Sequence, residues 1–205
     1  MSHNSGFFSS LIILALINTA CTTGTALRTA RVLEQGQLEF SGGLVSEGLT
    51  DVAQVLIGAY GITDRIEIEG RWEDNYIALT PRFQLLKSEK NGLDSLAFFE
   101  VGYNENLGFQ CGSGIMVGKK WDYVEPYFSY RFRHFTSVSS HHKHSKKYWL
   151  DLDQNVQYLK LGSRFYFSRP NEKSKRLFIG LEAGPQFQKS TGSWWEYAAN
   201  IGFTY

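Results

Sequence analysis

The stretch RIEIEGRWE, residues 65–73, decides the fold of this chain. Ile66, Ile68 and Trp72 would lie on one side of an extended strand, because successive side chains of a strand point to opposite faces. The charged residues would all lie on the other side, and a helix would instead spread them around its circumference. The segment is therefore predicted to be a strand with one apolar face and one charged face, the charged face being formed by Arg65, Glu67, Glu69, Arg71 and Glu73.

The same alternation recurs from Gln37 to the end of the chain. It predicts about ten strands of roughly 9 to 13 residues, long enough to cross a bilayer at a tilt, although eight or twelve strands also fit. One long connection, residues 136–154, would follow the seventh strand. The fold is therefore expected to be all-β, a single antiparallel transmembrane β-barrel. Its expected outward faces include Leu38, Phe40, Ala53, Val55, Ile57, Ala59, Leu79, Phe83, Phe99, Val101, Ile115, Phe128, Phe132, Leu159, Leu161, Leu177, Leu181, Trp195, Phe203 and Tyr205.

Composition supports strands and excludes some functions. The chain has 205 residues with 21 Lys plus Arg against 20 Asp plus Glu, so its charge balance gives no sign of nucleic-acid binding. Twenty glycines with only four prolines suit long strands joined by tight turns. No apolar run reaches the ~20 residues that a membrane-spanning helix needs.

Alternation alone does not say whether the apolar faces meet lipid or a protein core, because a soluble lipocalin-like barrel uses the inverse pattern. Aromatic residues near the expected strand ends favour lipid, as in the aromatic girdles of membrane barrels. Glycines on the polar face would relieve crowding in a narrow lumen. The last strand also resembles the C-terminal signal of outer-membrane proteins, with Phe203 and Tyr205 at its hydrophobic and final aromatic positions.

The N-terminus has the layout of an export signal, so it is set apart from the fold. An apolar stretch precedes Cys21, and LINTAC, residues 16–21, resembles the lipobox of bacterial lipoproteins. That resemblance implies a signal peptide over residues 1–20, cleaved before a lipid-bearing Cys21. The alternative is ordinary cleavage, for example after Ala26. The barrel would then occupy residues 37–205 after an N-terminal linker over residues 21–36, in a bacterial outer membrane with both termini periplasmic.

The polar faces predict a lumen that carries charges of both signs. Unpaired charges in a tight interior cost several kcal/mol each, so acids and bases on neighbouring strands are expected to pair. Two interpretations stay open: a salt-bridged filling that makes the barrel rigid, or a narrow path for ions or small solutes. The expected network comprises Arg65, Glu67, Glu69, Arg71, Arg82, Glu100, Arg131, Arg133, Arg164, Glu182 and Glu196.

The long connection is rich in histidine and lysine. Its imidazoles at His141, His142 and His144 are candidate metal ligands, although the neighbouring lysines would oppose a cation. A basic outer loop would also attract the phosphates of lipopolysaccharide. Expected partners are therefore outer-membrane lipids, lipopolysaccharide and the barrel-insertion machinery; we infer no cofactor and no obligate protein partner.

One stretch raises an enzymatic alternative. YRFRHFTS, residues 130–137, is similar to the His-x-Ser segment of the barrel lipid A 3-O-deacylase family. The resemblance implies His134 as the base, Thr136 in place of the serine nucleophile, and Asp151 or Asp153 as the orienting acid. Cys111 carries no nucleophile signature and is expected to be a small apolar filler. We therefore expect a non-catalytic envelope protein, with acyl hydrolysis and a narrow pore as alternatives.

Overall fold

The computed structural model describes residues 26–47, 51–88, 92–105, 108–136, 155–167, 175–188 and 192–205. These residues form an all-β structure without α-helices. Within these ranges no helix is long and apolar enough to span a membrane. The strands are β1 (Leu38–Glu47), β2 (Asp51–Thr63), β3 (Ile66–Glu73), β4 (Tyr76–Leu86), β5 (Asp94–Asn104), β6 (Gly108–Gly118), β7 (Val124–Phe135), β8 (Asn155–Tyr166), β9 (Arg176–Gln188) and β10 (Gly192–Thr204).

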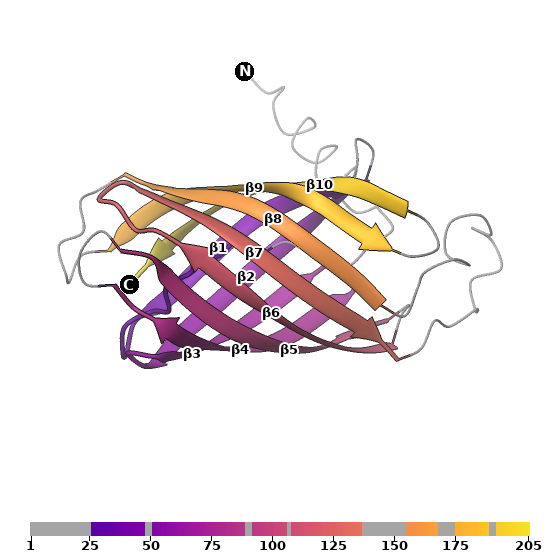
Figure 1. Cartoon of the computed structure of the whole chain (residues 1–205), viewed down its shortest axis with the longest axis horizontal. Coiled ribbons are helices and arrows are strands. Elements are labelled where there is room, and N and C mark those ends of the chain that lie inside the picture. Colours follow the sequence, from indigo (N-terminus) through magenta and orange to yellow (C-terminus); the bar gives the residue numbers. More distant parts are fainter. Residues whose placement is uncertain are drawn as a thin grey trace, which may run out of the picture.

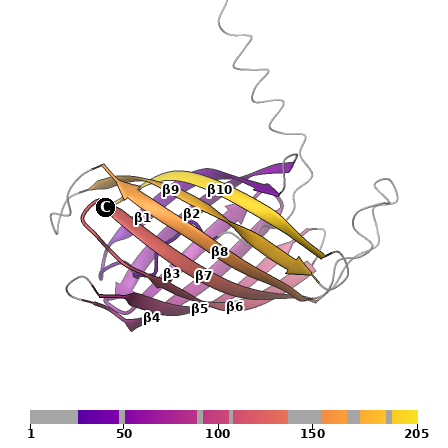
Figure 2. The same ribbon diagram turned by 45° about the horizontal axis from the view of Figure 1, so that its top comes forward.

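The ten strands close into one antiparallel barrel. Each strand pairs with its sequence neighbours, and β1 pairs with β10 in a register that sets Phe40 opposite Phe203. The rings of these two residues lie 5.9 Å apart between centroids. The strands run obliquely around the barrel axis (Figures 1 and 2). The expectation of about ten strands is confirmed, and closure leaves no sheet edge to be covered.

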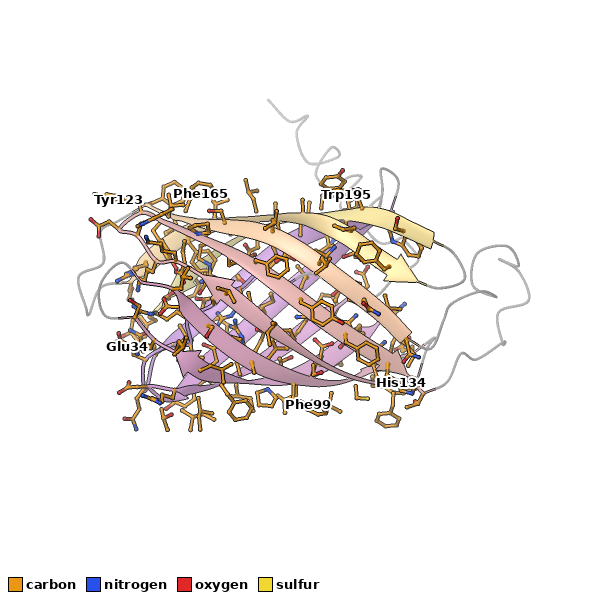
Figure 3. The ribbon with its side chains drawn as sticks, viewed as in Figure 1. Glu34, Phe99, Tyr123, His134, Phe165 and Trp195 are labelled. Carbon is orange, nitrogen blue, oxygen red and sulfur yellow. The ribbon has the colours of Figure 1, made fainter. Side chains whose placement is uncertain are left out.

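The two ends of the barrel differ. At the terminal end, where β1 begins and the chain finishes, Leu38 and Tyr205 exchange two backbone hydrogen bonds of 2.9 and 2.7 Å. The opposite end, called the loop end, carries the connection between β7 and β8. Figure 3 shows Glu34 and Tyr123 at the terminal end and His134 at the loop end. Of the long connection expected over residues 136–154, only Thr136 falls within the described residues.

The apolar faces point outward, away from the lumen. Along β3 the alternating burial places Glu67, Glu69 and Arg71 inside and leaves Trp72 42% exposed outside. Large apolar side chains are exposed on every strand, from 36% at Leu38 to 68% at Leu161. This chain therefore does not adopt the inverse arrangement of a soluble barrel, in which charged side chains lie outside and the core is apolar.

Strand β2 is the exception to the expected facing. We assigned Ala53, Val55, Ile57 and Ala59 to its outer face, but all four are at most 6% exposed and point inward. Its outer face is formed by the alternate residues, including Leu56, Tyr60 and Ile62. Both faces of β2 are apolar, so alternation could not distinguish them. The inward set is apolar because it packs against another part of the chain, described below.

Candidate functional site: the filled lumen

The lumen is lined by charged side chains that come from most strands of the wall. Lys160 on β8 lies 2.6 Å from the Glu196 carboxylate on β10, and both are at most 1% exposed. Arg164, also on β8, lies 2.8 Å from Glu39 on β1. Arg65 is different from the rest of the expected network: it lies in the exposed turn between β2 and β3, outside the lumen. Strand β3 begins at Ile66, one residue later than its alternation suggested.

The terminal half of the lumen is filled by a segment that belongs to no strand. Residues 26–33, except for the half-buried Arg31, are at most 8% exposed, and the chain emerges at Glu34 before β1 begins. Gly61 on β2 makes this exit possible, because a Cβ there would lie 2.1 Å from the Glu34 carbonyl oxygen. These residues fall in the stretch we expected to be a linker. We call residues 26–34 the inner segment.

Arg28 is the centre of the inner segment. Its guanidinium forms ion pairs with Glu39 and Glu67 through separate nitrogens and lies 3.5 Å from Glu69 through Nε. All four side chains are at most 4% exposed. Burial alone would lower the pKa of Arg28, but the three carboxylates raise it above its ordinary value. The guanidinium therefore stays charged and neutralises part of an otherwise acidic patch.

The wall also holds the backbone of the inner segment. The Glu182 carboxylate accepts hydrogen bonds from the backbone N–H groups of Ala26 and Leu27, at 2.8 and 2.9 Å. Gln84 accepts from Val32 at 2.7 Å and donates to the Ala30 carbonyl at 3.0 Å. Three wall arginines donate to backbone carbonyl oxygens of the segment: Arg71 to Ala26, Arg82 to Thr29 and Arg164 to Leu27. These contacts satisfy buried backbone groups that have no strand partner.

Apolar contacts complete the docking. Leu27 packs with Val45, Val55, Ile57 and Ala198, which explains why the inner face of β2 is apolar. Leu27 has φ +48°, a left-handed conformation that costs about 1–2 kcal/mol for a residue with a side chain. Its surroundings therefore impose the conformation. On the other side, the small side chains of the segment pack with Leu96, Phe98, Met116 and Tyr127.

The loop half of the lumen is filled by the wall's own side chains. Arg133 on β7 is fully buried between the rings of Tyr76 and Tyr158, with centroid distances of 5.1 and 5.4 Å. Glu100 pairs with Arg133 at 2.8 Å and with Arg131 at 3.2 Å. The tyrosines and arginines thus narrow the loop half without any contribution from the inner segment.

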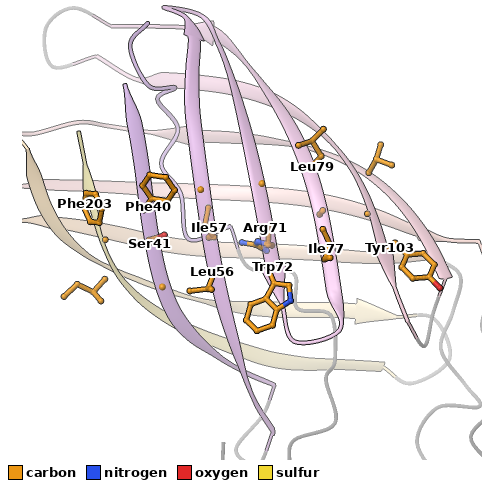
Figure 4. A pocket seen from close by; sticks show the side chains of 18 of the residues that line it. Phe40, Ser41, Leu56, Ile57, Arg71, Trp72, Ile77, Leu79, Tyr103 and Phe203 are labelled. Carbon is orange, nitrogen blue, oxygen red and sulfur yellow. The ribbon is translucent and has the colours of Figure 1, made fainter. Parts of the chain in front are cut away.

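The outer wall carries a shallow apolar hollow of about 1030 Å³ over the strands around β2 and β3 (Figure 4). Phe40, Leu56 and Trp72 border it, and outward glycines at Gly58 and Gly70 leave it open. Lipid acyl chains would fill such a surface in a bilayer, so we regard it as part of the wall.

The candidate acyl-hydrolase residues point away from the lumen. The Thr136 hydroxyl donates to the Phe109 carbonyl oxygen at 2.9 Å, and His134 Nδ1 lies 2.9 Å from Asn155 Oδ1. Each residue therefore has a partner other than the expected one. Asp153 falls outside the described residues.

Three other candidates receive no structural description. Cys21 and the histidines His141, His142 and His144 lie outside the described residues. Among the residues that the structure describes, no group of three or more His, Cys, Asp or Glu side chains is arranged to hold a metal. Cys111 is a free thiol, half-buried on the outer face of β6.

Sequence reasoning did not identify Arg28, Tyr76 or Tyr158, which occupy the interior beside the expected wall charges. Arg28 precedes the first strand and belongs to no periodic pattern, so no signal identified it. Tyr76 and Tyr158 were missed because inward aromatics look like outward ones in a two-residue alternation. A parity count along each strand from the charged residues Arg82 and Lys160 would have placed both rings inside.

Comparison with known proteins shows similarity only to solved barrel structures. No family model matches the chain, and no curated protein matches it in sequence. A NanC porin structure shares 12% identity with a TM-score of 0.45, over 82% of this chain and 98% of that one. The outer-membrane protein OprD from Pseudomonas aeruginosa shares 10% identity with a TM-score of 0.32, over 83% of this chain and 65% of that one. At these values no function is carried over from either protein.

Proposed function

We propose that this protein is an integral outer-membrane β-barrel whose lumen is a narrow passage for ions or small solutes, closed in the conformation described above. The observation that carries the proposal is the division of the wall: large apolar side chains exposed outside and buried, paired charges inside. Exposed apolar surface of this extent, distributed around a whole barrel, is typical of contact with lipid. A polar interior behind it is typical of a path for water and solutes.

A passage fits the interior better than a permanent filling does. Eight-stranded barrels have interiors just wide enough for side chains to fill, and ten strands enclose more room. In this barrel the additional room holds the inner segment, which forms no strand pairing with the wall. Departure of that segment would leave the ladder of ten strands intact. The space it vacates would then be about as wide as an extended chain.

Two measurements test the proposal in sequence. The full-length protein should be found in outer-membrane fractions and migrate differently on gels before and after heating, as folded membrane barrels do. Recovery in a soluble periplasmic extract without detergent would contradict the membrane location. Purified protein in planar bilayers should then give rare, discrete conductance steps. A folded protein that never conducts, even after the perturbations described below, would leave a purely structural envelope barrel as the function.

We also propose the orientation and contacts of the barrel. Membrane barrels place long loops outside the cell and short turns in the periplasm, so the terminal end would be periplasmic. A lipid on Cys21, lipopolysaccharide around the loop end and the barrel-insertion machinery belong to the same proposal. Protease added to intact cells should cut within residues 137–154, and labelled palmitate should be incorporated through Cys21. Cleavage only after the outer membrane is opened would reverse the orientation.

A further inference from the structure

Arg28 is the side chain of the inner segment that contacts the most wall carboxylates in the described ion pairs. Arg28 directs three different nitrogens at three carboxylates, from Glu39 on β1 and from Glu67 and Glu69 on β3. This use of a planar, five-donor group is specific to guanidinium, since an ammonium is a compact point charge. The other contacts are hydrogen bonds of the segment's backbone to wall side chains, and small apolar surfaces.

The wall carboxylates that bind Arg28 have other ion-pair partners, which remain when this contact is lost. Glu39 retains Arg164 at 2.8 Å, and Glu67 retains Arg82 at 2.5 Å, when Arg28 is removed. Each of those two carboxylates therefore keeps one partner that cannot leave, because it is part of a strand. At the loop end the corresponding arginines are all on wall strands. The difference separates a detachable plug from a fixed constriction.

We propose that residues 26–34 are an autoinhibitory plug and that the ion pairs of Arg28 with Glu39, Glu67 and Glu69 are its latch. The proposal rests on the passage proposed above and names how that passage is regulated. Release of the latch lets the plug leave through the terminal end, hinging at the exposed residues 34–36. Gly36 suits this role because its φ of +80° is a conformation that glycine adopts readily.

Conductance of the full-length protein in planar bilayers tests the latch. Arg28→Ala should raise the fraction of time spent open about tenfold or more, because loss of a charge-assisted contact changes an equilibrium by at least that factor. Arg28→Lys should give an intermediate value. Arg31→Ala is the matched control, since it removes the same charge from a partly exposed arginine of the same segment. Equal opening in the control and in Arg28→Ala would overturn the latch.

A disulfide shows whether opening requires the plug to move. A Cβ built on Gly118 would lie 2.9 Å from the Ala30 Cβ, so Ala30→Cys with Gly118→Cys places two thiols within reach after a small shift. In an Arg28→Ala background lacking Cys111, oxidation should close the barrel and reduction should open it again. Opening that ignores the crosslink would exclude plug movement.

Thiol labelling separates failure of the latch from failure of the passage. With Ala30→Cys alone and Cys111→Ser, a membrane-impermeant maleimide should react at least about tenfold faster when Arg28→Ala is present. The parent without Ala30→Cys measures any labelling at Cys21. Unchanged labelling in a folded, heat-modifiable variant overturns the latch. Faster labelling without conductance supports the latch and removes the passage.

Discussion

The two halves of the lumen solve the same problem with different parts of the chain. In the loop half, buried Arg133 lies between Tyr76 and Tyr158 and pairs with Glu100, all four being on wall strands. In the terminal half, equally buried Arg28 comes from a segment outside the wall. A buried charge needs a partner in either place. Only the terminal half can exchange its arginine for water without unfolding the barrel.

The largest expected effect separates the two arginines by stability. Arg133→Ala removes a charge that the wall cannot replace, leaves Glu100 with Arg131 as its ion-pair partner and opens a gap between two rings. It should lower the free energy of unfolding by about 3–5 kcal/mol. Arg28→Ala should cost less than half of that, because the plug can leave and water can solvate the carboxylates. Urea titration of the heat-modifiable folded form measures both.

Conductance should rank the same pair in the opposite order. Arg28→Ala opens the terminal half, whereas Arg133→Ala alone leaves the plug in place and the barrel closed. Because the side chains of the loop half form a constriction in series with the plug, the double variant should conduct more per step than Arg28→Ala does. If the two single variants lose equal stability and conduct equally, the distinction between a fixed constriction and a detachable plug fails.

A smaller effect tests the wall that both halves share. Leu56→Arg places a charge on the outer face of β2, where Leu56 is 55% exposed. It should destabilise the barrel by about 2–4 kcal/mol if the site is near the bilayer midplane. Gln54→Arg is the matched control on the same face, two residues nearer the loop end, with an expected cost of about 0–1 kcal/mol. If both substitutions change the free energy of unfolding equally little, the other face of β2 must be the one that contacts lipid.

The facing of β2 also gives a test of packing across the plug. Leu27→Ala and Ile57→Ala each remove part of one apolar cluster. Their effects should be non-additive by about 0.5–3 kcal/mol, because either change loosens the same contact. The pair Phe135→Ala and Val156→Ala, both on wall strands, is the comparison at the loop end. When Arg28→Ala releases the plug, coupling should vanish for the first pair and persist for the second.

The outcome on β2 shows where sequence reasoning works and where it stops. Where charges mark one face, as on β3, alternation distinguishes the two faces: Glu67, Glu69 and Arg71 are buried, whereas Arg65 lies in the turn before the strand. Where both faces are apolar, the pattern cannot show which face points inward, since that depends on what lies inside the barrel. What lies inside β2 is Leu27, a residue distant from the strand pattern. The inner segment has no periodicity of its own, so its position could come only from the three-dimensional structure.

The smallest expected effect concerns the rim of the plug. Arg31 lies 3.2 Å from Asp94, but its side chain is 20% exposed, so water competes for both charges. Arg31→Ala should therefore change the free energy of unfolding by less than about 1 kcal/mol. The same variant should leave the fraction of time that the barrel spends open unchanged. The three carboxylates that hold Arg28 do not contact Arg31 in the described ion pairs. If Arg31→Ala lowered the free energy of unfolding and raised the open fraction as much as Arg28→Ala does, charge at the rim, rather than the buried latch, would hold the plug.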